Sequence, residues 1–211
     1  LELGSKDKIA LDIGCADGKF TLSIAPYFKK VYGIDNSKVN LEIAESHSTE
    51  ERSQNVEYSL QDASQTSFKD SFFDLAYCRR GPSYYEEYHR ILKTNGYYLE
   101  IGIGEEDTME LQKVFGRGQG YGKWDKPRLD QDLREFRSLG FEIIFGENFH
   151  CFEYYPSYEE LDMFLQGVPI FEDYDSQKDK AKLEEYVSQN TTPKGIILPR
   201  HRIVLAAKLV K

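Results

Sequence analysis

The segment that decides the fold is Ala10-Leu-Asp-Ile-Gly-Cys-Ala-Asp-Gly-Lys19. An apolar run over residues 9–13 enters a glycine-containing turn, and residues 19–28 then have the spacing of a helix. Gly14 permits a sharp backbone turn, and Gly18 permits the start of the helix to approach a ligand closely. A strand, a glycine turn and a helix in this order predict a ligand-binding crevice at the carboxyl end of the strand, as in doubly wound sheets.

Strands and helices continue to alternate along the chain on short connections. This alternation predicts an α/β fold with a doubly wound, mostly parallel sheet of seven strands. The predicted strands cover residues 9–13, 31–34, 56–60, 72–78, 97–103, 141–145 and 202–209. The predicted helices cover residues 19–28, 83–93, 129–139 and a segment that Ser37 caps and that ends near Ser46.

Two segments interrupt the alternation. Residues 104–128 are long and irregular, and their stretch Gly116-Arg-Gly-Gln-Gly-Tyr-Gly122 predicts a lid hinge, with an RNA-binding stretch as the alternative. Residues 151–190 contain two helical patterns, 158–165 and 177–189, together with ten acidic and three basic residues. We expect residues 151–190 to form a small helical cap; a peripheral helical pair is the alternative.

Length and charge restrict the class of protein. A chain of 211 residues suggests a single domain over residues 1–211, into which the cap is inserted. The net charge of −9 disfavours nucleic acid as a partner, because an acidic chain repels polyphosphate. No apolar stretch approaches the ~18 residues of a membrane span, and the polar residues 1–8 lack the order of a signal peptide.

Cysteine and histidine spacing disfavours a metal centre. The cysteines form no C-x-x-C pair, which favours a reducing cytoplasm, and the histidines show no H-x-x-x-H spacing. We therefore expect no metal site. The residues concerned are Cys15, Cys78, Cys151, His47, His89, His150 and His201.

Asp35 closes the second predicted strand, about 20 residues after Gly14, where an acid can accept hydrogen bonds from ribose hydroxyls. Its alternative role is that of an acid at a helix N-terminus. A dinucleotide site requires the pattern G-x-G-x-x-G, which lets the pyrophosphate lie at the helix N-terminus, whereas this turn has the pattern Gly14-x-x-x-Gly18. Asp12 and Asp17 beside the turn would repel pyrophosphate and suit a ligand with an ammonium and a sulfonium. A dehydrogenase is therefore disfavoured.

Asp12-Ile-Gly-Cys-Ala-Asp-Gly18 resembles motif I of the class I S-adenosylmethionine-dependent methyltransferases, (D/E)-x-G-x-G-x-G. Four later stretches resemble further family motifs, and the resemblance covers residues 9–103 in order and spacing. Residues 201–209 resemble the antiparallel last strand of this family. Two departures are Ala16, in place of the middle glycine, and the absence of an N-P-P-Y or D-P-P-Y sequence in the fourth motif. The four stretches are Tyr32-Gly-Ile-Asp-Asn-Ser37, Gln61-Asp-Ala63, Phe73-Asp-Leu-Ala-Tyr-Cys78 and Leu92-Lys-Thr-Asn-Gly-Tyr-Tyr-Leu99.

The resemblance implies that S-adenosyl-L-methionine is the cofactor and assigns its contacts. The first motif would hold the methionine moiety, with Asp12 near its ammonium. Asp35 would bind the ribose, Asp62 with Ala63 the adenine, and Cys78 with Arg79 would lie under the sulfonium. Alternatives remain open: Asp12 as a turn cap, Asp62 as an exposed turn residue, and the cysteines as packed residues. The implied cofactor-binding residues are Asp12, Gly14, Cys15, Ala16, Gly18, Asp35, Asn36, Asp62, Ala63, Cys78 and Arg79.

The acceptor side is less defined in the sequence. Methyl transfer requires alignment and exclusion of water, and a base only if the acceptor must lose a proton. Arg79 could clamp an anionic group of the acceptor or pair with the acidic cap, and His150 could be a base or a surface residue. No other catalytic candidate is evident.

We expect a methyltransferase that acts on a small, uncharged or cationic molecule, as a monomer or homodimer. The first alternative is an RNA (rRNA or tRNA) methyltransferase, which would need a contiguous basic face. The second is a cofactor-binding module without catalysis. The basic face would be built from Arg79, Arg80, Arg117, Lys123, Lys126 and Arg128.

Overall fold

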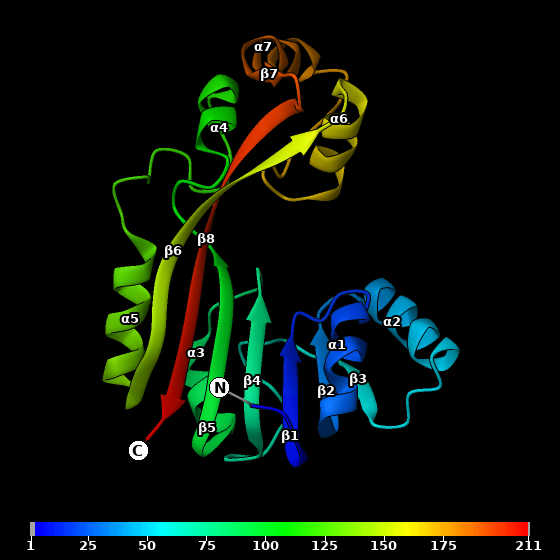
Figure 1. The fold of residues 1–211 in the computed structure, drawn as a ribbon, viewed down its shortest axis with the longest axis vertical. Coiled ribbons are helices and arrows are strands. Elements are labelled where there is room, and N and C mark those ends of the chain that lie inside the picture. The colour runs from blue at the N-terminus through cyan, green and yellow to red at the C-terminus, as the bar shows by residue number, and fades with distance from the viewer. Residues whose placement is uncertain (1–2, 211) are drawn as a thin grey trace. The chain divides into compact units, whose positions relative to one another are not determined.

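The computed structural model describes residues 3–210, and its framework is one mixed sheet (Figure 1). The strand order is β3-β2-β1-β4-β5-β8-β6, with the short β7 beside β8. The pairs among β1 to β5 are parallel, and β8 runs opposite to β5 (Figure 1). This confirms the predicted sheet class and its antiparallel last strand. The strands are β1 (Ser5–Ile13), β2 (Phe28–Asp35), β3 (Val56–Leu60), β4 (Phe73–Arg79), β5 (Leu92–Ile103), β6 (Phe141–Tyr155), β7 (Thr191–Thr192) and β8 (Gly195–Leu209).

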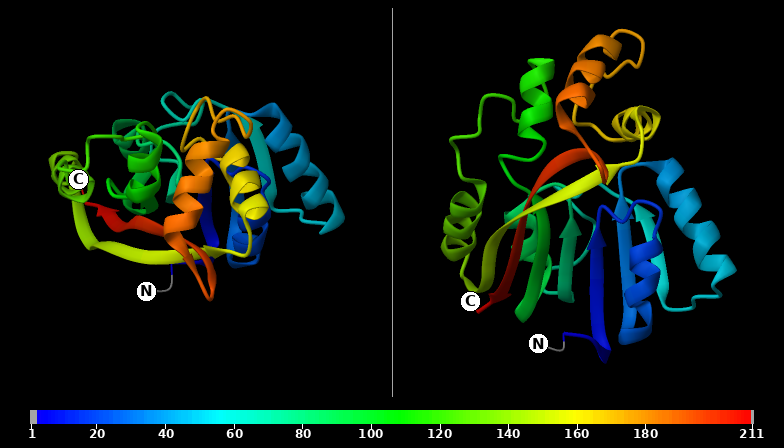
Figure 2. Two further views of the ribbon diagram at one scale, coloured as in Figure 1. Left: turned by 90° about the horizontal axis from the view of Figure 1, so that it is seen from above. Right: turned by 45° about the horizontal axis from the view of Figure 1, so that its top comes forward.

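Helices connect most of these strands. Ser37 caps α2 through a hydrogen bond that its side chain accepts from the Asn40 amide, as predicted. Figure 2 shows the helices and the long neighbouring strands β6 and β8 from two further directions. The helices are α1 (Lys19–Ile24), the 3-10 turn η1 (Ala25–Tyr27), α2 (Lys38–Glu50), α3 (Tyr85–Ile91), α4 (Met109–Phe115), α5 (Arg128–Ser138), α6 (Tyr158–Gly167) and α7 (Lys180–Asn190).

Both faces of the parallel strands are buried. Successive residues of a strand point to opposite faces, and in β1 they enter two different hydrophobic clusters. Leu11 packs in a cluster with Tyr85 and Tyr88 of α3. Ala10 packs in a cluster to which Phe20 of α1 also belongs. Helices therefore cover the two faces of the sheet, as a doubly wound fold requires.

The chain divides into two compact units. Unit 1 consists of the described residues of Leu1–Gly102, Asp130–Glu147 and Ile203–Lys211, and unit 2 of Ile103–Leu129 and Asn148–Arg202. Unit 2 contains the predicted cap, residues 151–190, and has a hydrophobic core of its own. That core includes Leu111, Phe115, Leu161, Leu165, Phe171, Leu183, Tyr186, Ile196 and Leu198.

Several predicted segments need correction. The strand predicted over residues 141–145 continues to Tyr155, so residues 151–155 of the predicted cap belong to β6. The helix predicted over residues 83–93 ends at Ile91, because Leu92 begins β5.

The helix predicted over residues 19–28 ends at Ile24, since a 3-10 turn that contains Pro26 begins at Ala25 and Phe28 already belongs to β2. The irregular stretch 104–128 contains helix α4, whose Leu111 and Phe115 are buried one turn apart. Gly116 ends α4 in the left-handed conformation, so this glycine is a helix C-cap.

Across the described residues, no helix combines the length and the apolar character that a bilayer crossing requires.

Candidate functional site

The turn after β1 is held by the end of β2. The amides of Gly14 and Cys15 both donate to the carbonyl of Ile34, at 2.9 and 3.0 Å. Gly14 has a φ of 72°, and a Cβ placed on it would find its nearest atom, the Gly81 Cα, 4.0 Å away. The backbone at Gly14 is therefore sharply bent, and no side chain lies within 4 Å of that Cβ position.

Asp35 organises this turn from the end of β2. Its Oδ2 accepts a hydrogen bond from the Ala16 amide and its Oδ1 one from the Ser37 amide, both at 2.9 Å. The side chain of Asn40 also donates to Oδ1, at 3.4 Å. Asp35 is 9% exposed, so it joins the β1 turn to the start of α2 from a nearly buried position. A carboxylate oxygen accepts two hydrogen bonds, which leaves Oδ2 capacity for a ligand hydroxyl.

Gly18 is required by packing inside the protein. Its φ is 73°, and a Cβ there would lie 2.4 Å from the Tyr58 hydroxyl and 2.8 Å from the Ala44 Cβ. The prediction that Gly18 lets the start of the helix approach a ligand stays a prediction; the structure adds that Gly18 makes room for side chains of β3 and α2. Sequence reasoning missed Tyr58 and Ala44, because no local pattern marks a contact across three elements.

Asp12 is a buried carboxylate at the end of β1, with 2% of its surface exposed. Its Oδ2 accepts a hydrogen bond of 2.6 Å from the Thr21 hydroxyl on α1. Burial raises the pKa of Asp12 to about 6, although Thr21, Tyr77 and the positive charge of Arg79 oppose the shift. Asp12 thus ties β1 to α1 through a side chain rather than through the turn amides.

Asp62 and Ala63 follow β3, beside the end of β2. The Gln61 amide donates to the Asp35 carbonyl at 3.1 Å, which brings the two strand ends together. Asp62 is exposed, and the hydrogen bond from the Ser64 amide to its Oδ1 lowers its pKa. Ala63 packs against the core cluster. The carboxylate of Asp62 is therefore held in a turn and remains accessible to a ligand.

The residues at the end of β4 have two distinct environments. Cys78 is 1% exposed, and its thiol donates to the Pro82 carbonyl at 3.7 Å. Cys15 is also buried, and burial raises the pKa of its thiol well above the usual range. Both cysteines therefore have the environment of packed residues. Arg79 is exposed, and its guanidinium lies 3.8 Å from the centre of the Phe20 ring.

Unit 1 brings the predicted cofactor residues together at the carboxyl ends of four adjacent parallel strands. Asn36 is exposed between Asp35 and Ser37. Thr21 and Phe20 are additional residues that sequence reasoning did not single out. The residues brought together are Asp12, Gly14, Cys15, Ala16, Gly18, Asp35, Asn36, Asp62, Ala63, Cys78 and Arg79.

The other catalytic candidate, His150, belongs to unit 2. Its Nε2 lies 3.0 Å from a carboxylate oxygen of Glu106, and its ring stacks on His201 at 4.2 Å. His201 is 2% exposed, and burial, followed by the effect of His150, lowers its pKa. The structure thus groups His150 with residues of unit 2, whereas Arg79 belongs to unit 1.

Two of the arginines proposed for a basic face have partners within unit 2. Arg117 pairs with Asp173 at 3.1 Å and with Asp179 at 2.8 Å. Arg128 donates to the Ile103 carbonyl at 2.8 Å. Both guanidinium groups thus already have partners within the protein, which weakens the argument that they form a basic face for RNA.

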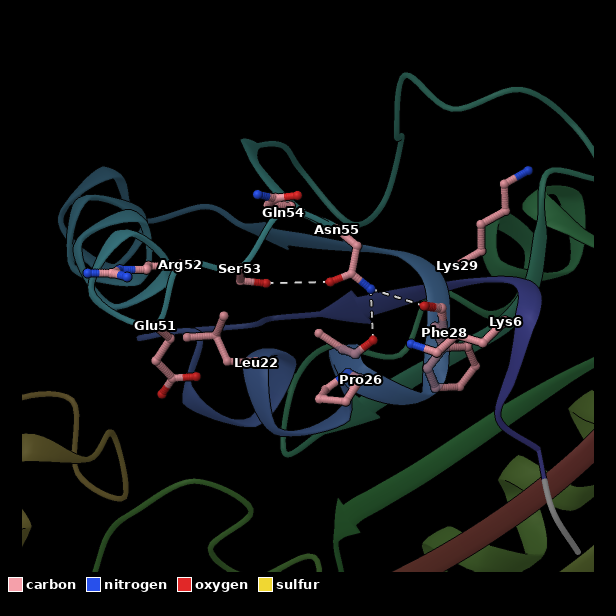
Figure 3. Close-up of a pocket in the computed structure, with 11 residues that line it drawn as sticks. Lys6, Leu22, Pro26, Phe28, Lys29, Glu51, Arg52, Ser53, Gln54 and Asn55 are labelled. Carbon is pink, nitrogen blue, oxygen red and sulfur yellow. Dashed lines mark hydrogen bonds between the residues drawn. The ribbon is translucent and has the colours of Figure 1, made fainter.

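An open hollow of about 580 Å³ lies elsewhere in unit 1, between the end of α1, the start of β2 and the α2–β3 connection (Figure 3). Asn55 spans it, and its amide donates to the carbonyls of Ala25 and Phe28 at 2.8 and 3.0 Å. The hollow thus adjoins the amino end of β2, whereas ligands of doubly wound sheets bind beyond the carboxyl ends. Since the side-chain amide of Asn55 already donates to two backbone carbonyls, we do not assign a ligand to this hollow.

Comparison with known proteins identifies the type of domain. Residues 10–96 match a family described as a methyltransferase domain. An uncharacterized methyltransferase of Bacillus subtilis, YcgJ, is 31% identical over 98 residues, which are 43% of this chain and 39% of that protein. A Dictyostelium discoideum relative is 36% identical over 97 residues and is matched over 35% of its length. The matched region thus spans little more than a third of these curated relatives.

Solved structures extend the likeness in fold. The structure of YcgJ has a TM-score of 0.72 with 17% identity, and the match covers 99% of this chain and 94% of that one. A geranyl diphosphate C-methyltransferase from Streptomyces coelicolor, solved with S-adenosyl-L-homocysteine, has a TM-score of 0.60 with 15% identity. That match covers all of this chain and 76% of the other. At these identities the likeness is one of fold.

Proposed function

Since residues 10–96 carry a methyltransferase domain on the class I fold, we propose that this protein transfers a methyl group from S-adenosylmethionine to a small molecule. The observation that supports this most is the turn at Gly14, which is sharply bent, has only the Gly81 Cα within 4 Å of its Cβ position, and is held by Asp35. The carboxylates of Asp12 and Asp35 match a ligand that carries an ammonium, a sulfonium and ribose hydroxyls.

The residues of unit 1 have distinct tasks in this proposal. The Gly14 turn receives the methionine moiety, Oδ2 of Asp35 accepts from a ribose hydroxyl, and Asp62 reaches the adenine. Asp12 places a negative charge behind the turn. When bound, S-adenosylmethionine supplies an electrophilic methyl group. The chain supplies orientation and exclusion of water, and a base only for an acceptor that must lose a proton.

We propose that the acceptor is small and uncharged or cationic, and that the protein acts as a monomer or homodimer in a reducing cytoplasm. The net charge of −9 supports this acceptor class. The pairing of Arg117 with two aspartates reduces the basic surface that an RNA substrate would need. The three cysteines are free thiols, which supports a reducing compartment.

Calorimetric titration with S-adenosylhomocysteine tests the cofactor site through the variant Gly14→Leu. We expect affinity to fall at least about tenfold, or 1.4 kcal/mol, because a leucine side chain would extend from the turn into the region proposed for the ligand. The matched control is Gly122→Leu. Gly122 has a φ of 74°, close to the 72° of Gly14, and nothing lies within 4 Å of its Cβ position, so both variants carry a similar backbone strain of about 1–2 kcal/mol.

Two results would contradict the proposal: no binding by the wild-type protein, or equal affinities for all three proteins. If binding is confirmed, a screen of small uncharged and cationic molecules for methylated products tests the acceptor class. Binding without any methylated product, from small molecules or RNA, would favour a cofactor-binding module without catalysis.

A further inference from the structure

Arg79 is an exposed cation at the carboxyl end of β4, in the region of unit 1 proposed for the cofactor. Its guanidinium lies over the Phe20 ring, 3.8 Å from the ring centre. Across residues 3–210, this guanidinium has no carboxylate or carbonyl partner. The contact with the ring holds the group in place, while its five N–H donors remain available to a ligand.

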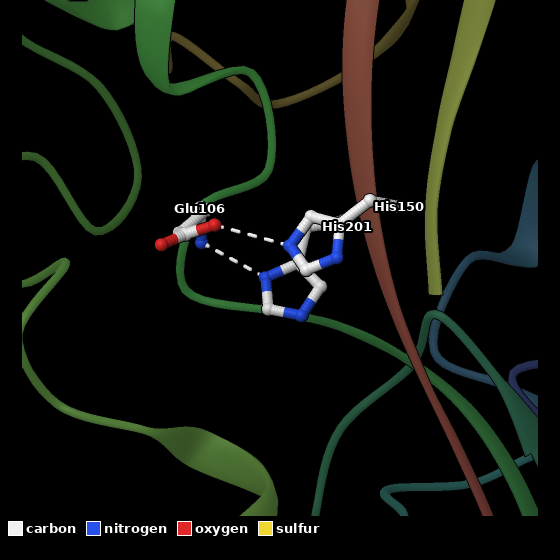
Figure 4. A group of neighbouring side chains, drawn as sticks. All are labelled: Glu106, His150 and His201. Carbon is white, nitrogen blue, oxygen red and sulfur yellow. Dashed lines mark hydrogen bonds and ion pairs between the residues drawn. The ribbon is translucent and has the colours of Figure 1, made fainter. Parts of the chain in front are cut away.

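Other charged side chains show the contrast. Lys19, at the start of α1, pairs with Asp17 at 3.2 Å. In unit 2, the carboxylate of Glu106 lies 3.0 Å from Nε2 of His150 (Figure 4). These groups have their partners within the protein, whereas Arg79 is positioned without one.

The register of the sheet places Arg79 beside the Gly14 turn. Strands β1 and β4 are parallel neighbours, with Asp12 opposite Tyr77. Arg79 follows Tyr77 by two residues, as Gly14 follows Asp12, and side chains two apart on a strand point to the same face. The positive charge of Arg79 lowers the pKa of Asp12 against the effect of burial, so the two charges are within electrostatic reach.

The amino-acid part of the proposed cofactor brings the charges that complement this pair. At neutral pH, S-adenosylmethionine has two cationic groups, an ammonium and a sulfonium, and one anionic group, the α-carboxylate. Like charges repel, so an uncompensated guanidinium beside the Gly14 turn would weaken binding of a sulfonium. The carboxylate is the only group of the cofactor that can compensate Arg79.

We propose that the guanidinium of Arg79 binds the α-carboxylate of the cofactor, while Asp12 provides the negative charge for its α-ammonium. A planar guanidinium with paired donors matches a carboxylate in shape and in charge. Arg79 is then a specificity residue that selects adenosyl ligands with a complete amino-acid end. The resemblance placed Arg79 under the sulfonium; here it recognises a different group of the same ligand. This inference rests on the proposed function.

Calorimetric titration with two ligands that differ by one carboxylate tests the assignment. S-adenosylhomocysteine has this group, and its decarboxylated form, an adenosyl thioether that ends in a primary amine, keeps the ammonium, ribose and adenine. We expect the wild-type protein to bind S-adenosylhomocysteine about 10- to 100-fold more tightly than the amine. Arg79→Gln should lose about the same factor for S-adenosylhomocysteine and bind the amine within about threefold of the wild type.

Two variants accompany this test. Arg79→Lys keeps the charge without the paired donors and should retain part of the preference. Arg80→Gln is the matched control, since it removes an exposed arginine one residue further along and should retain the whole preference. Thermal unfolding verifies that each variant is folded.

The outcomes separate this inference from the proposed function. A wild-type protein that binds both ligands equally would overturn the role of Arg79 alone. The same holds if Arg79→Gln weakens both ligands by one factor, as a purely structural residue would, or if the preference disappears in Arg80→Gln instead. A wild-type protein that binds neither ligand would overturn the proposed function and this inference with it.

Discussion

Replacing Asp12 by asparagine should stabilise the protein near neutral pH and weaken its cofactor site. Burial raises the pKa of Asp12 from 3.8 to about 6, so the folded protein pays for an ionised carboxylate at pH 7. At about 1.4 kcal/mol per pH unit, this difference corresponds to a cost of about 3 kcal/mol. Asparagine is neutral, and its side-chain oxygen can still accept from Thr21. We expect a gain of about 1–3 kcal/mol.

The pH dependence of this gain provides the sharper test. The folded pKa lies above the unfolded one, so the cost is complete above pH 6 and decreases as the pH falls through that value. Between about pH 7.5 and 5, the wild-type protein should gain about 1.4 kcal/mol from protonation of Asp12. The asparagine variant lacks this gain, so its advantage should shrink by the same amount.

Urea unfolding of both proteins at the two pH values measures these free energies. Asp125→Asn is the control, since Asp125 is exposed and its replacement should change stability by less than about 0.5 kcal/mol. Titration with S-adenosylhomocysteine should show at least about tenfold weaker binding by Asp12→Asn. A variant that is no more stable than the wild type at pH 7.5, or an advantage that does not shrink at pH 5, would refute the reasoning.

Two further predictions concern the free energy of unfolding. Gly104→Ala should lower the free energy of unfolding by about 1–3 kcal/mol, since the added Cβ would meet the His201 ring. The control is Gly167→Ala, whose Cβ meets no atom within 4 Å and should leave stability nearly unchanged. Thermal unfolding of the two variants and the wild type measures the difference. Asn55→Leu should cost about 1–3 kcal/mol by leaving two backbone carbonyls without their donor, yet leave S-adenosylhomocysteine affinity unchanged. Loss of binding by a folded Asn55→Leu protein would implicate the hollow of Figure 3 in ligand binding.

The sequence was most informative where fold and site depend on the same local pattern. The run into Gly14 and the acid at Asp35 predicted two parallel strands and the turn between them, and the structure has both. The strand over Val56–Leu60 was predicted to the residue. Such features can be predicted from sequence because a backbone with positive φ favours glycine, and a buried strand requires a local run of apolar residues.

Features that depend on tertiary contacts could not be predicted in this way. Helix α4 was missed because its seven residues are helical through packing of Leu111 and Phe115 in the core of unit 2. Thr21 gains its role only from the distance to Asp12. The pairing of His150 with His201 depends on the adjacency of β6 and β8, which no spacing along the chain encodes.

The division of the chain into interleaved segments has a consequence for synthesis on the ribosome. Most of unit 1 is made first, but Leu205, Ala207 and Leu209 of its main cluster are made after all of unit 2. The nascent chain therefore carries an incomplete apolar core until the last strand leaves the exit tunnel. Contacts this distant in sequence slow folding and prolong exposure to aggregation. Strand β8 thus completes an apolar core to which β1, made much earlier, already contributes Leu11 and Ile13.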